Sequence, residues 1–241
     1  MRPPTERPTV AVILFDSPRF LALDKPSGLS MATPRGGEQG AVERLAEAAG
    51  LPAGASRDLL LVHRLDVGTS GVVLLAKDPE AHRAASVLFQ ERKVGKTYRA
   101  LVWGHPKPAA GLIEAPLAMD REDRRKMKVA GDGKPASTEY RTLDRLASVA
   151  HLELSPRTGR THQIRVHLAS RGHPIVGDDL YGGPRWRGVR DPALRRILRE
   201  VPRLLLHAHR LEFADPFSGE AVRIESPEPS PFAEVVAAAR A

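Results

Sequence analysis

The sequence contains no cysteine in its 241 residues, which excludes disulfide bonds and thiolate metal sites. It also lacks an apolar run near the roughly 18 residues that a membrane span requires. The start, "MRPPTERPTV", is polar and proline-rich, without the apolar core of a secretory signal. From these absences we expect a soluble, cytoplasmic protein that does not bind membranes.

Several cofactor-binding motifs are absent as well. No G-x-x-x-x-G-K-[ST] phosphate loop occurs, and no G-x-G-x-x-G follows a strand pattern. His162 and His167 are five residues apart, so on a helix they diverge by about 140° and cannot share a metal ion. His207 and His209 have no carboxylate nearby and are interpreted as ordinary surface histidines. The sequence therefore predicts neither a metal ion nor an organic cofactor.

Acidic charge is in short supply, with 29 acids against 37 lysines and arginines and a formal net charge of +8. The excess of positive charge is clustered in two segments of the chain. Four arginines and no acid lie between Arg157 and Arg171, and seven arginines against two acids lie between Arg185 and Arg203. Arginine-rich genome composition would also raise the count, since only eight of the 37 cations are lysine. The clustering favours a polyanionic partner, usually a nucleic acid.

Strand and helix patterns alternate irregularly along the chain, which predicts a mixed α+β fold rather than a parallel sheet. Three helices are expected to start at Asp–Pro or Ser–Pro pairs, because the first residue caps the helix and proline fits its first turn. The expected strands are 10–15, 20–24, 96–103, 204–213 and 221–225, and the expected helices are 39–49, 79–92, 161–171, 192–200 and 231–240. We expect residues 1–9 to be a flexible tail and residues 10–241 to form a single domain. A monomer is the default expectation.

The stretch "LVHRLDVGTSGVVLLAK", residues 61–77, is expected to form a buried hairpin with charged residues at its turn. Arg64 and Asp66 follow a strand pattern at positions i and i+2, which would place both side chains on one side. Taken alone, Asp66 is best explained as a turn-capping residue helped by neighbouring glycines.

Two other polar residues beside apolar faces, Arg165 and Tyr98, favour a functional role for Asp66 over a purely structural one. Arg165 borders the apolar stripe of Ile164 and Leu168, so its guanidinium either needs an anionic partner or extends into water. Tyr98 lies on the apolar face of the strand "KTYRALVW", where a tyrosine is ordinarily part of the core. The polar segment Arg121–Lys134 could be an insertion or an RNA-facing arm, although a solvated surface loop is the simpler interpretation.

Together these segments resemble the RluA family of pseudouridine synthases. The resemblance is carried by "HRLDVGTSGVVLLAK", "KTYRALVWG", "GRTHQIRVHLASRGHPIVGDDLYGG" and "LLHAHRLEF", with weaker matches in "DKPSGLSM" and "GKPASTEY". It extends from about Phe15 to Ile224. Asp215 departs from the family, which often has histidine there, and nothing before Val10 resembles the S4 RNA-binding domain of many relatives. A member with only the catalytic domain is the expectation.

The resemblance implies a pseudouridine-synthase-like fold, in which helices and loops flank a mixed, largely antiparallel sheet. It also implies isomerisation of uridine in structured RNA, either ribosomal or transfer RNA, through base flipping. By resemblance, Asp66 is the catalytic aspartate, Arg165 pairs with it and keeps it ionised, and Tyr98 lies against the target base. Arg64 fills the space that the flipped nucleotide leaves.

The remaining expected site residues bind the RNA itself. They are His63 beside Arg64 and the segment that begins the helix after "RTG", where free backbone N–H groups favour phosphate: Arg157, Arg160, Thr161, His162 and Gln163. Two alternatives stay open at this point. A non-catalytic RNA-binding module would explain the basic clusters but not an Asp–Arg pair. A nucleoside hydrolase would need a second carboxylate to activate water, and the sequence offers none.

Overall fold

The computed structural model describes residues 11–31, 39–52 and 54–240. The expected flexible tail, residues 1–9, lies outside this part of the chain. The chain forms two compact units, one comprising residues 1–95 and 210–226 and the other residues 96–209 and 227–241. Each unit is described by itself below, and the expected single domain stays a prediction.

The first unit contains an antiparallel sheet built around one hairpin. Strand β1 (Val12–Asp16) pairs with β2 (Phe20–Lys25), as the sequence predicts, and β2 pairs with β4 (Ser70–Ala76). The next strand is β11 (Leu206–Ala214), whose last five residues belong to this unit and pair with β12 (Ala221–Glu225). The short β3 (Leu60–Leu61) pairs with the end of β4. Every residue of β4 is buried, so this strand is covered on both of its faces.

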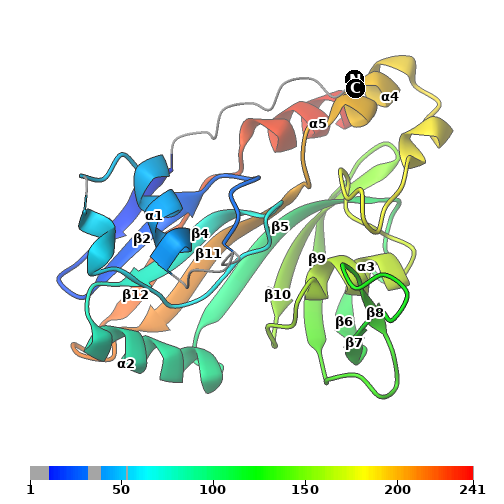
Figure 1. Cartoon of the computed structure of the whole chain (residues 1–241). Helices are drawn as coiled ribbons and strands as arrows, with labels where there is room; N and C mark the ends of the chain where they lie inside the picture. Colours follow the sequence, from blue (N-terminus) through cyan, green and yellow to red (C-terminus); the bar gives the residue numbers. More distant parts are fainter. Residues whose placement is uncertain (1–10, 32–38, 53, 241) are drawn as a thin grey trace. The chain divides into compact units, whose positions relative to one another are not determined.

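Two α-helices and a short 3-10 helix, drawn in blue to teal in Figure 1, complete this unit. These are α1 (Gln39–Ala48), η1 (Ala55–Arg57) and α2 (Pro79–Gln90). Asp78 caps α2 as expected, because its carboxylate accepts a hydrogen bond of 2.8 Å from the Ala81 N–H. Ala81 and Ala85 of α2 pack in one cluster with Phe20 and Leu74 of the sheet.

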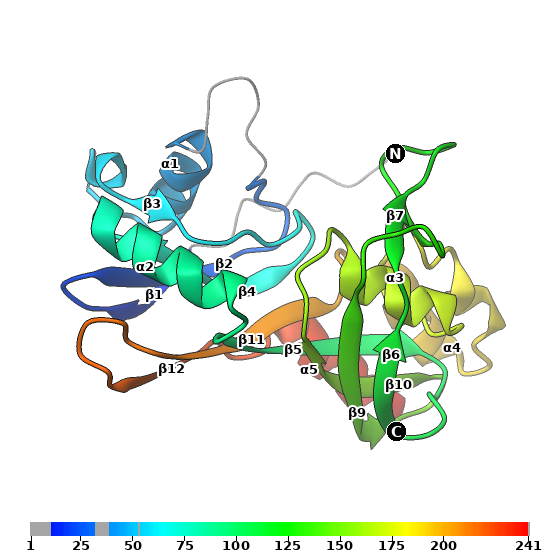
Figure 2. The same ribbon diagram turned by 90° about the horizontal axis from the view of Figure 1, so that it is seen from below.

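The second unit is also built on antiparallel strands. Its strands follow the order β11, β5 (Gly95–Trp103), β10 (Val149–Pro156), β9 (Ser137–Arg145) and β6 (Ala110–Glu114). The pairings of β5 with β10, β10 with β9 and β9 with β6 are all antiparallel. A separate hairpin of β7 (Leu117–Met119) and β8 (Met127–Val129) lies beside helix α3 (Figure 2).

Helices supply the rest of this unit's core. They are α3 (Gln163–Ser170), η2 (Arg185–Gly188), α4 (Pro192–Glu200) and α5 (Ser230–Arg240). Asp191 caps α4 through a 2.6 Å hydrogen bond from the Leu194 N–H, as the sequence predicts. The cluster formed by these helices and the sheet includes Leu152, Leu168, Leu198 and Phe232, all at most 4% exposed.

The α+β class and the largely antiparallel sheet are confirmed, whereas several details are corrected. The polar segment Arg121–Lys134 is not a plain loop, because it contains β8 and the tip of the β7–β8 hairpin. The helix expected from Thr161 starts at Gln163, after a turn. His207 is 1% exposed and packs against Phe232, so it is not a surface histidine.

His167 on α3 gives the second unit a predicted pH dependence. Its side chain is fully buried, with Nδ1 bonded to the Thr138 hydroxyl (2.9 Å) and Nε2 to the Ala115 carbonyl (3.0 Å). Burial lowers its pKa from the ordinary value of 6.5. Below about that pH the unfolded chain binds a proton that the folded chain does not. The free energy of unfolding should therefore fall as pH drops from 6.5 toward the folded-state pKa, and keep its full value above 6.5.

Urea unfolding between pH 8 and pH 5 checks this prediction. His167→Gln keeps a donor for the Ala115 carbonyl but cannot take up a proton, so its loss of stability over this range should be smaller than that of the wild type. Equal losses in the two proteins would contradict the assignment.

Candidate active site

The loop that carries Asp66 belongs to the first unit. Strand β3 ends at Leu61, so Arg64 and Asp66 lie in a segment without regular secondary structure beyond the strand, and not at its end as expected. Within this segment Leu65 is 7% exposed, Arg64 is exposed and Asp66 is partly buried. Because this segment is not a strand, the common orientation expected for the Arg64 and Asp66 side chains stays a prediction.

A buried lysine braces the turn after Asp66. Lys25, at the end of β2, is fully buried, and its ammonium donates hydrogen bonds to the carbonyls of Pro26 (2.9 Å), Leu29 (2.9 Å) and Val67 (3.2 Å). The Gly28 N–H donates to the same Val67 carbonyl at 2.8 Å. The segment "DKPSG", a weaker element of the sequence resemblance, thus fixes the backbone next to Asp66.

His63 is held by the protein itself. Its Nε2 accepts a 3.1 Å hydrogen bond from the Leu74 N–H, and its ring stacks on Phe89 with centroids 4.9 Å apart. Both contacts fix the start of the loop against β4 and α2. They give His63 a structural role, and the RNA contact expected from the sequence stays a prediction.

Arg165, in the second unit, has a carboxylate partner that the sequence patterns did not reveal. Its Nε donates to Oδ2 of Asp178 at 2.8 Å and its Nη2 donates to Oδ1 at 2.9 Å. The Asp178 side chain is 0% exposed and that of Arg165 is 11% exposed. Oδ1 of Asp178 also accepts from the backbone N–H groups of Leu180 (3.0 Å) and Tyr181 (3.1 Å). This two-point pair fixes the plane of the guanidinium.

Glycines on either side of Asp178 allow the chain to make this turn. Gly177 has a φ of +77°, and a Cβ there would lie 2.0 Å from the carbonyl oxygen of Arg203. A Cβ at Gly182 would lie 2.7 Å from the carbonyl oxygen of Asp178. The motif "GDDLYG" therefore positions the Asp178 carboxylate through a turn that only glycine permits at these two points.

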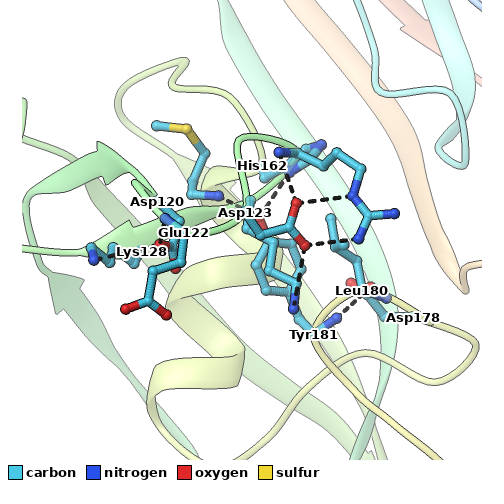
Figure 3. A network of polar contacts seen from close by, with 11 residues as sticks. Asp120, Glu122, Asp123, Lys128, His162, Asp178, Leu180 and Tyr181 are labelled. Atoms are coloured by element: carbon cyan, nitrogen blue, oxygen red, sulfur yellow. Dashed lines mark hydrogen bonds and ion pairs between the residues drawn. The ribbon is translucent and has the colours of Figure 1, made fainter.

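Tyr181 connects three parts of the second unit (Figure 3). Its hydroxyl accepts a hydrogen bond from the Met127 N–H of β8 at 2.8 Å and contacts Nδ1 of His162 at 2.8 Å. The guanidinium carbon of Arg165 lies 5.0 Å from the centre of its ring, within cation–π range. Met127, His162 and Arg165 are thereby held by one side chain.

The other site residues predicted in the second unit differ in how exposed their side chains are to a bound RNA. Tyr98 lies on β5 opposite Leu154, partly buried against the core cluster. Arg160 and Thr161 are exposed, as an RNA contact requires. Arg157 is exposed too, but it forms an ion pair with Glu139.

Gln163 is 4% exposed and its amide is fully used. Its Oε1 accepts from the Thr158 hydroxyl (2.6 Å) and the Arg160 N–H (3.1 Å), and its Nε2 donates to the Ser137 carbonyl (2.9 Å) and the Thr138 hydroxyl (3.0 Å). These bonds indicate that Gln163 shapes the loop before α3 instead of touching RNA as expected.

Asp66 belongs to the first unit, whereas Tyr98 and Arg165 belong to the second. The meeting of these three side chains, and with it the Asp66–Arg165 pair, stays a prediction. In the described ranges, no group of three or more histidine or acidic side chains could hold a metal ion. Nor does any helix there have the length and apolar character of a membrane span.

Comparison with known proteins gives a consistent result. Residues 19–170 match the family model described as RNA pseudouridylate synthase. The dual-specificity RNA pseudouridine synthase RluA of Escherichia coli K12 is 39% identical over 218 residues, which cover 90% of this chain and 92% of the relative. The ribosomal large subunit pseudouridine synthase D of Pseudomonas aeruginosa is 37% identical over 227 residues, covering 91% of this chain and 69% of that protein.

A solved structure agrees with these relatives. The human RNA pseudouridylate synthase domain containing 1 matches with a TM-score of 0.74 at 28% identity, covering 93% of this chain and 87% of the human chain. The matched segment of the family model contains the loop of Asp66, strand β5 with Tyr98 and helix α3 with Arg165. The chain belongs to the RluA family of RNA pseudouridine synthases, isomerases that convert uridine into pseudouridine.

Proposed function

We propose that the protein isomerises specific uridines in ribosomal or transfer RNA, with Asp66 as the catalytic carboxylate. The observation that carries this proposal is the braced loop Arg64–Leu65–Asp66, which presents a partly buried carboxylate beside an exposed arginine. The same residues lie in the "HRLD" motif that matches the family. The relatives' names support the RNA class, since one is called dual-specificity and another is named for the ribosomal large subunit.

The reaction needs one well-placed carboxylate and no redox partner. The bond from C1′ to N1 breaks, the base turns, C1′ bonds to C5, C5 loses its proton and N1 gains one from solvent. The numbers of atoms and electrons in the nucleotide do not change. Asp66 acts on the sugar as nucleophile or as base, and either role requires its ionised form.

Arg165 has a defined task in this proposal. The Nε and Nη2 groups of Arg165 donate hydrogen bonds to Asp178. We propose that its third nitrogen, Nη1, points toward Asp66. Partial burial alone would favour the protonated form of an aspartate, and a nearby guanidinium favours the charged form. Arg165 thereby keeps Asp66 ionised in a site from which the flipped base excludes water.

Tyr98 and Arg64 complete the proposed site. Tyr98 lies against the flipped base and is our candidate for removing the C5 proton, which is the last step of the isomerisation. Arg64, the exposed neighbour of Asp66, fills the space that the flipped nucleotide leaves. Unstacking a base costs a few kcal/mol, and a side chain that replaces the base in the stack offsets part of this cost.

We assign phosphate binding to Arg160, Thr161 and His162 before α3, together with Arg157, whose ion pair with Glu139 is exposed and easily exchanged. The second arginine cluster supplies further positive charge. On α4, Leu194 and Leu198 are buried while Arg195, Arg196 and Arg199 are exposed, so the helix presents a basic face. Nucleic-acid phosphates are the expected partner of such a face.

RNA affinity should accordingly fall steeply as salt rises, because each phosphate that the protein neutralises releases counterions. In the double variant Arg157→Gln/Arg160→Gln, the slope of log K against log salt should decrease by about 0.7–0.9 for each phosphate that is no longer neutralised. Filter binding between 50 and 300 mM KCl measures the slope. An affinity that does not change with salt would show that the arginine clusters do not touch RNA.

Tritium release from RNA labelled at C5 of uridine tests the proposed reaction. Pseudouridine formation expels the C5 hydrogen, whereas a hydrolase would release the base with its tritium, and a binding module would do neither. We expect tritium release by the purified protein, unchanged after dialysis against EDTA. Free base that retains tritium, or turnover that needs an added divalent ion, would contradict the proposal. The cytoplasmic location and the monomeric state stay predictions.

A further inference from the structure

We infer that Asp178 and Tyr181 are positioning residues for Arg165, and that the Tyr181 hydroxyl couples the β7–β8 hairpin to that arginine. The inference rests on the proposed role of Arg165 in keeping Asp66 ionised. It adds two residues and a connection to the hairpin that the proposed mechanism does not contain. All the contacts that carry it lie within the second unit.

Asp178 has every feature of an orienting carboxylate. Its side chain is 0% exposed, and its two oxygens accept four hydrogen bonds, two from Arg165 and two from backbone N–H groups. A buried ion pair contributes little net stability, because desolvating two charges offsets their attraction. What it does supply is geometry: Nε and Nη2 are fixed on one edge of the guanidinium, so the direction of Nη1 is fixed as well.

The guanidinium of Arg165 lies over the ring of Tyr181, and the Tyr181 hydroxyl contacts His162 (Figure 3). Because the hydroxyl accepts from the Met127 N–H, it can donate its own proton to Nδ1 of His162. His162 has a φ of 54°, in the left-handed region that few residues other than glycine adopt. Tyr181 therefore fixes the turn before α3 as well as the arginine within α3.

The hairpin is attached to α3 at this point. Met127 and Tyr181 pack on the cluster of Leu117, Ala136 and Val166, and Val166 follows Arg165 in α3. At the hairpin tip, Asp123 accepts two hydrogen bonds from the Arg125 side chain. The β7–β8 hairpin is therefore connected to Tyr181 through Met127, and Tyr181 contacts Arg165.

Asp178→Asn tests the positioning role, because asparagine keeps the shape but cannot accept both guanidinium bonds. We expect kcat for tritium release to fall 10- to 100-fold while the RNA dissociation constant stays within twofold. The acid limb of the kcat–pH profile should move to higher pH, as a displaced Arg165 leaves Asp66 easier to protonate. Asp144→Asn is the matched control, since Asp144 also binds an arginine, Arg240, through two nitrogens (2.6 and 3.1 Å), but at the surface.

Tyr181→Phe tests whether the Tyr181 hydroxyl couples the β7–β8 hairpin to Arg165, in a variant that keeps the core packed. The ring stays against Arg165 and only the hydroxyl bonds to Met127 and His162 are removed, so we expect a smaller fall in kcat, of 3- to 10-fold. Asp178→Asn added to Arg165→Lys should lower kcat less than twofold further, because both changes act through one guanidinium.

The positioning role would be overturned if Asp178→Asn kept the wild-type kcat and the wild-type acid limb. It would also be overturned if the reductions in kcat caused by Asp178→Asn and Arg165→Lys multiplied in the double variant. A wild-type kcat in Tyr181→Phe would overturn the coupling. These outcomes are distinct from failure of the proposed function, which would show as turnover by Asp66→Asn. If Asp66→Asn is inactive and Asp178→Asn behaves as wild type, the proposed function stands and only this inference fails.

Discussion

Replacing Asp66 by asparagine is expected to abolish pseudouridine formation, with a loss of about 10³-fold or more in kcat. Asparagine has nearly the shape of aspartate and can still bond to a turn, so the fold should persist. It cannot act as nucleophile or base toward C1′. RNA affinity should stay near the wild-type value, because arginines elsewhere bind the phosphates. Thermal unfolding, filter binding and tritium release measure the three quantities.

The matched control is Asp58→Asn, at an exposed aspartate before β3 in the same unit. It should leave all three quantities unchanged. If Asp66 only capped a turn, Asp66→Asn would be folded and active, so turnover near the wild-type rate would refute the assignment. A fall in activity matched by a fall in the folded fraction would likewise indicate a structural role.

Replacing Arg165 by lysine should have the second largest effect, about 10²-fold in kcat. Lysine keeps the positive charge but has no planar fork, so it cannot bind both oxygens of Asp178 and still reach Asp66. RNA affinity should change much less than kcat. Arg165→Ala should in addition move the acid limb of the pH–rate profile to higher pH, since an unpaired and partly buried aspartate is easier to protonate.

Tritium-release assays over pH 4.5 to 8 would give the acid limb for the wild type and both variants. Arg171→Lys, at an exposed arginine just after α3, serves as the control for arginine-to-lysine replacement on this element. Full activity of Arg165→Lys with an unshifted acid limb would mean that Arg165 serves only to pair with Asp178.

Local patterns predicted most of the elements. The caps Asp78 and Asp191 begin α2 and α4 because their carboxylates bond to backbone N–H groups a few residues away. The alternation of Tyr98, Ala100 and Val102 predicted β5, and the resemblance to a known family predicted the mixed antiparallel sheet. Because Arg165 borders an apolar stripe, its guanidinium was expected either to need an anionic partner or to extend into water, and the structure supplies a partner in Asp178.

Tertiary contacts explain what the patterns missed. Asp178 lies 13 residues from Arg165, across a turn that depends on Gly177, so no helical spacing relates the two. The role of Lys25 depends on the carbonyl of Val67, which is 42 residues away. Both lie inside the family motifs "GDDLYGG" and "DKPSG", which were the only signal that the sequence offered for them.

The β7–β8 hairpin was missed for a related reason. Its strands have three residues each, too few for an alternating pattern to show in a polar segment. They are held by packing of Met127 on α3 and by the hydroxyl of Tyr181, neither of which a pattern of charges reveals.

The most direct test of the central claim is a map of pseudouridines in ribosomal and transfer RNA from cells that carry the gene and cells that lack it. The deletion strain would be complemented with the wild-type protein or with Asp66→Asn at equal abundance. We predict that one or more pseudouridines disappear on deletion, return with the wild-type protein and do not return with Asp66→Asn. Identical maps in all four strains, or restoration by Asp66→Asn, would contradict the account.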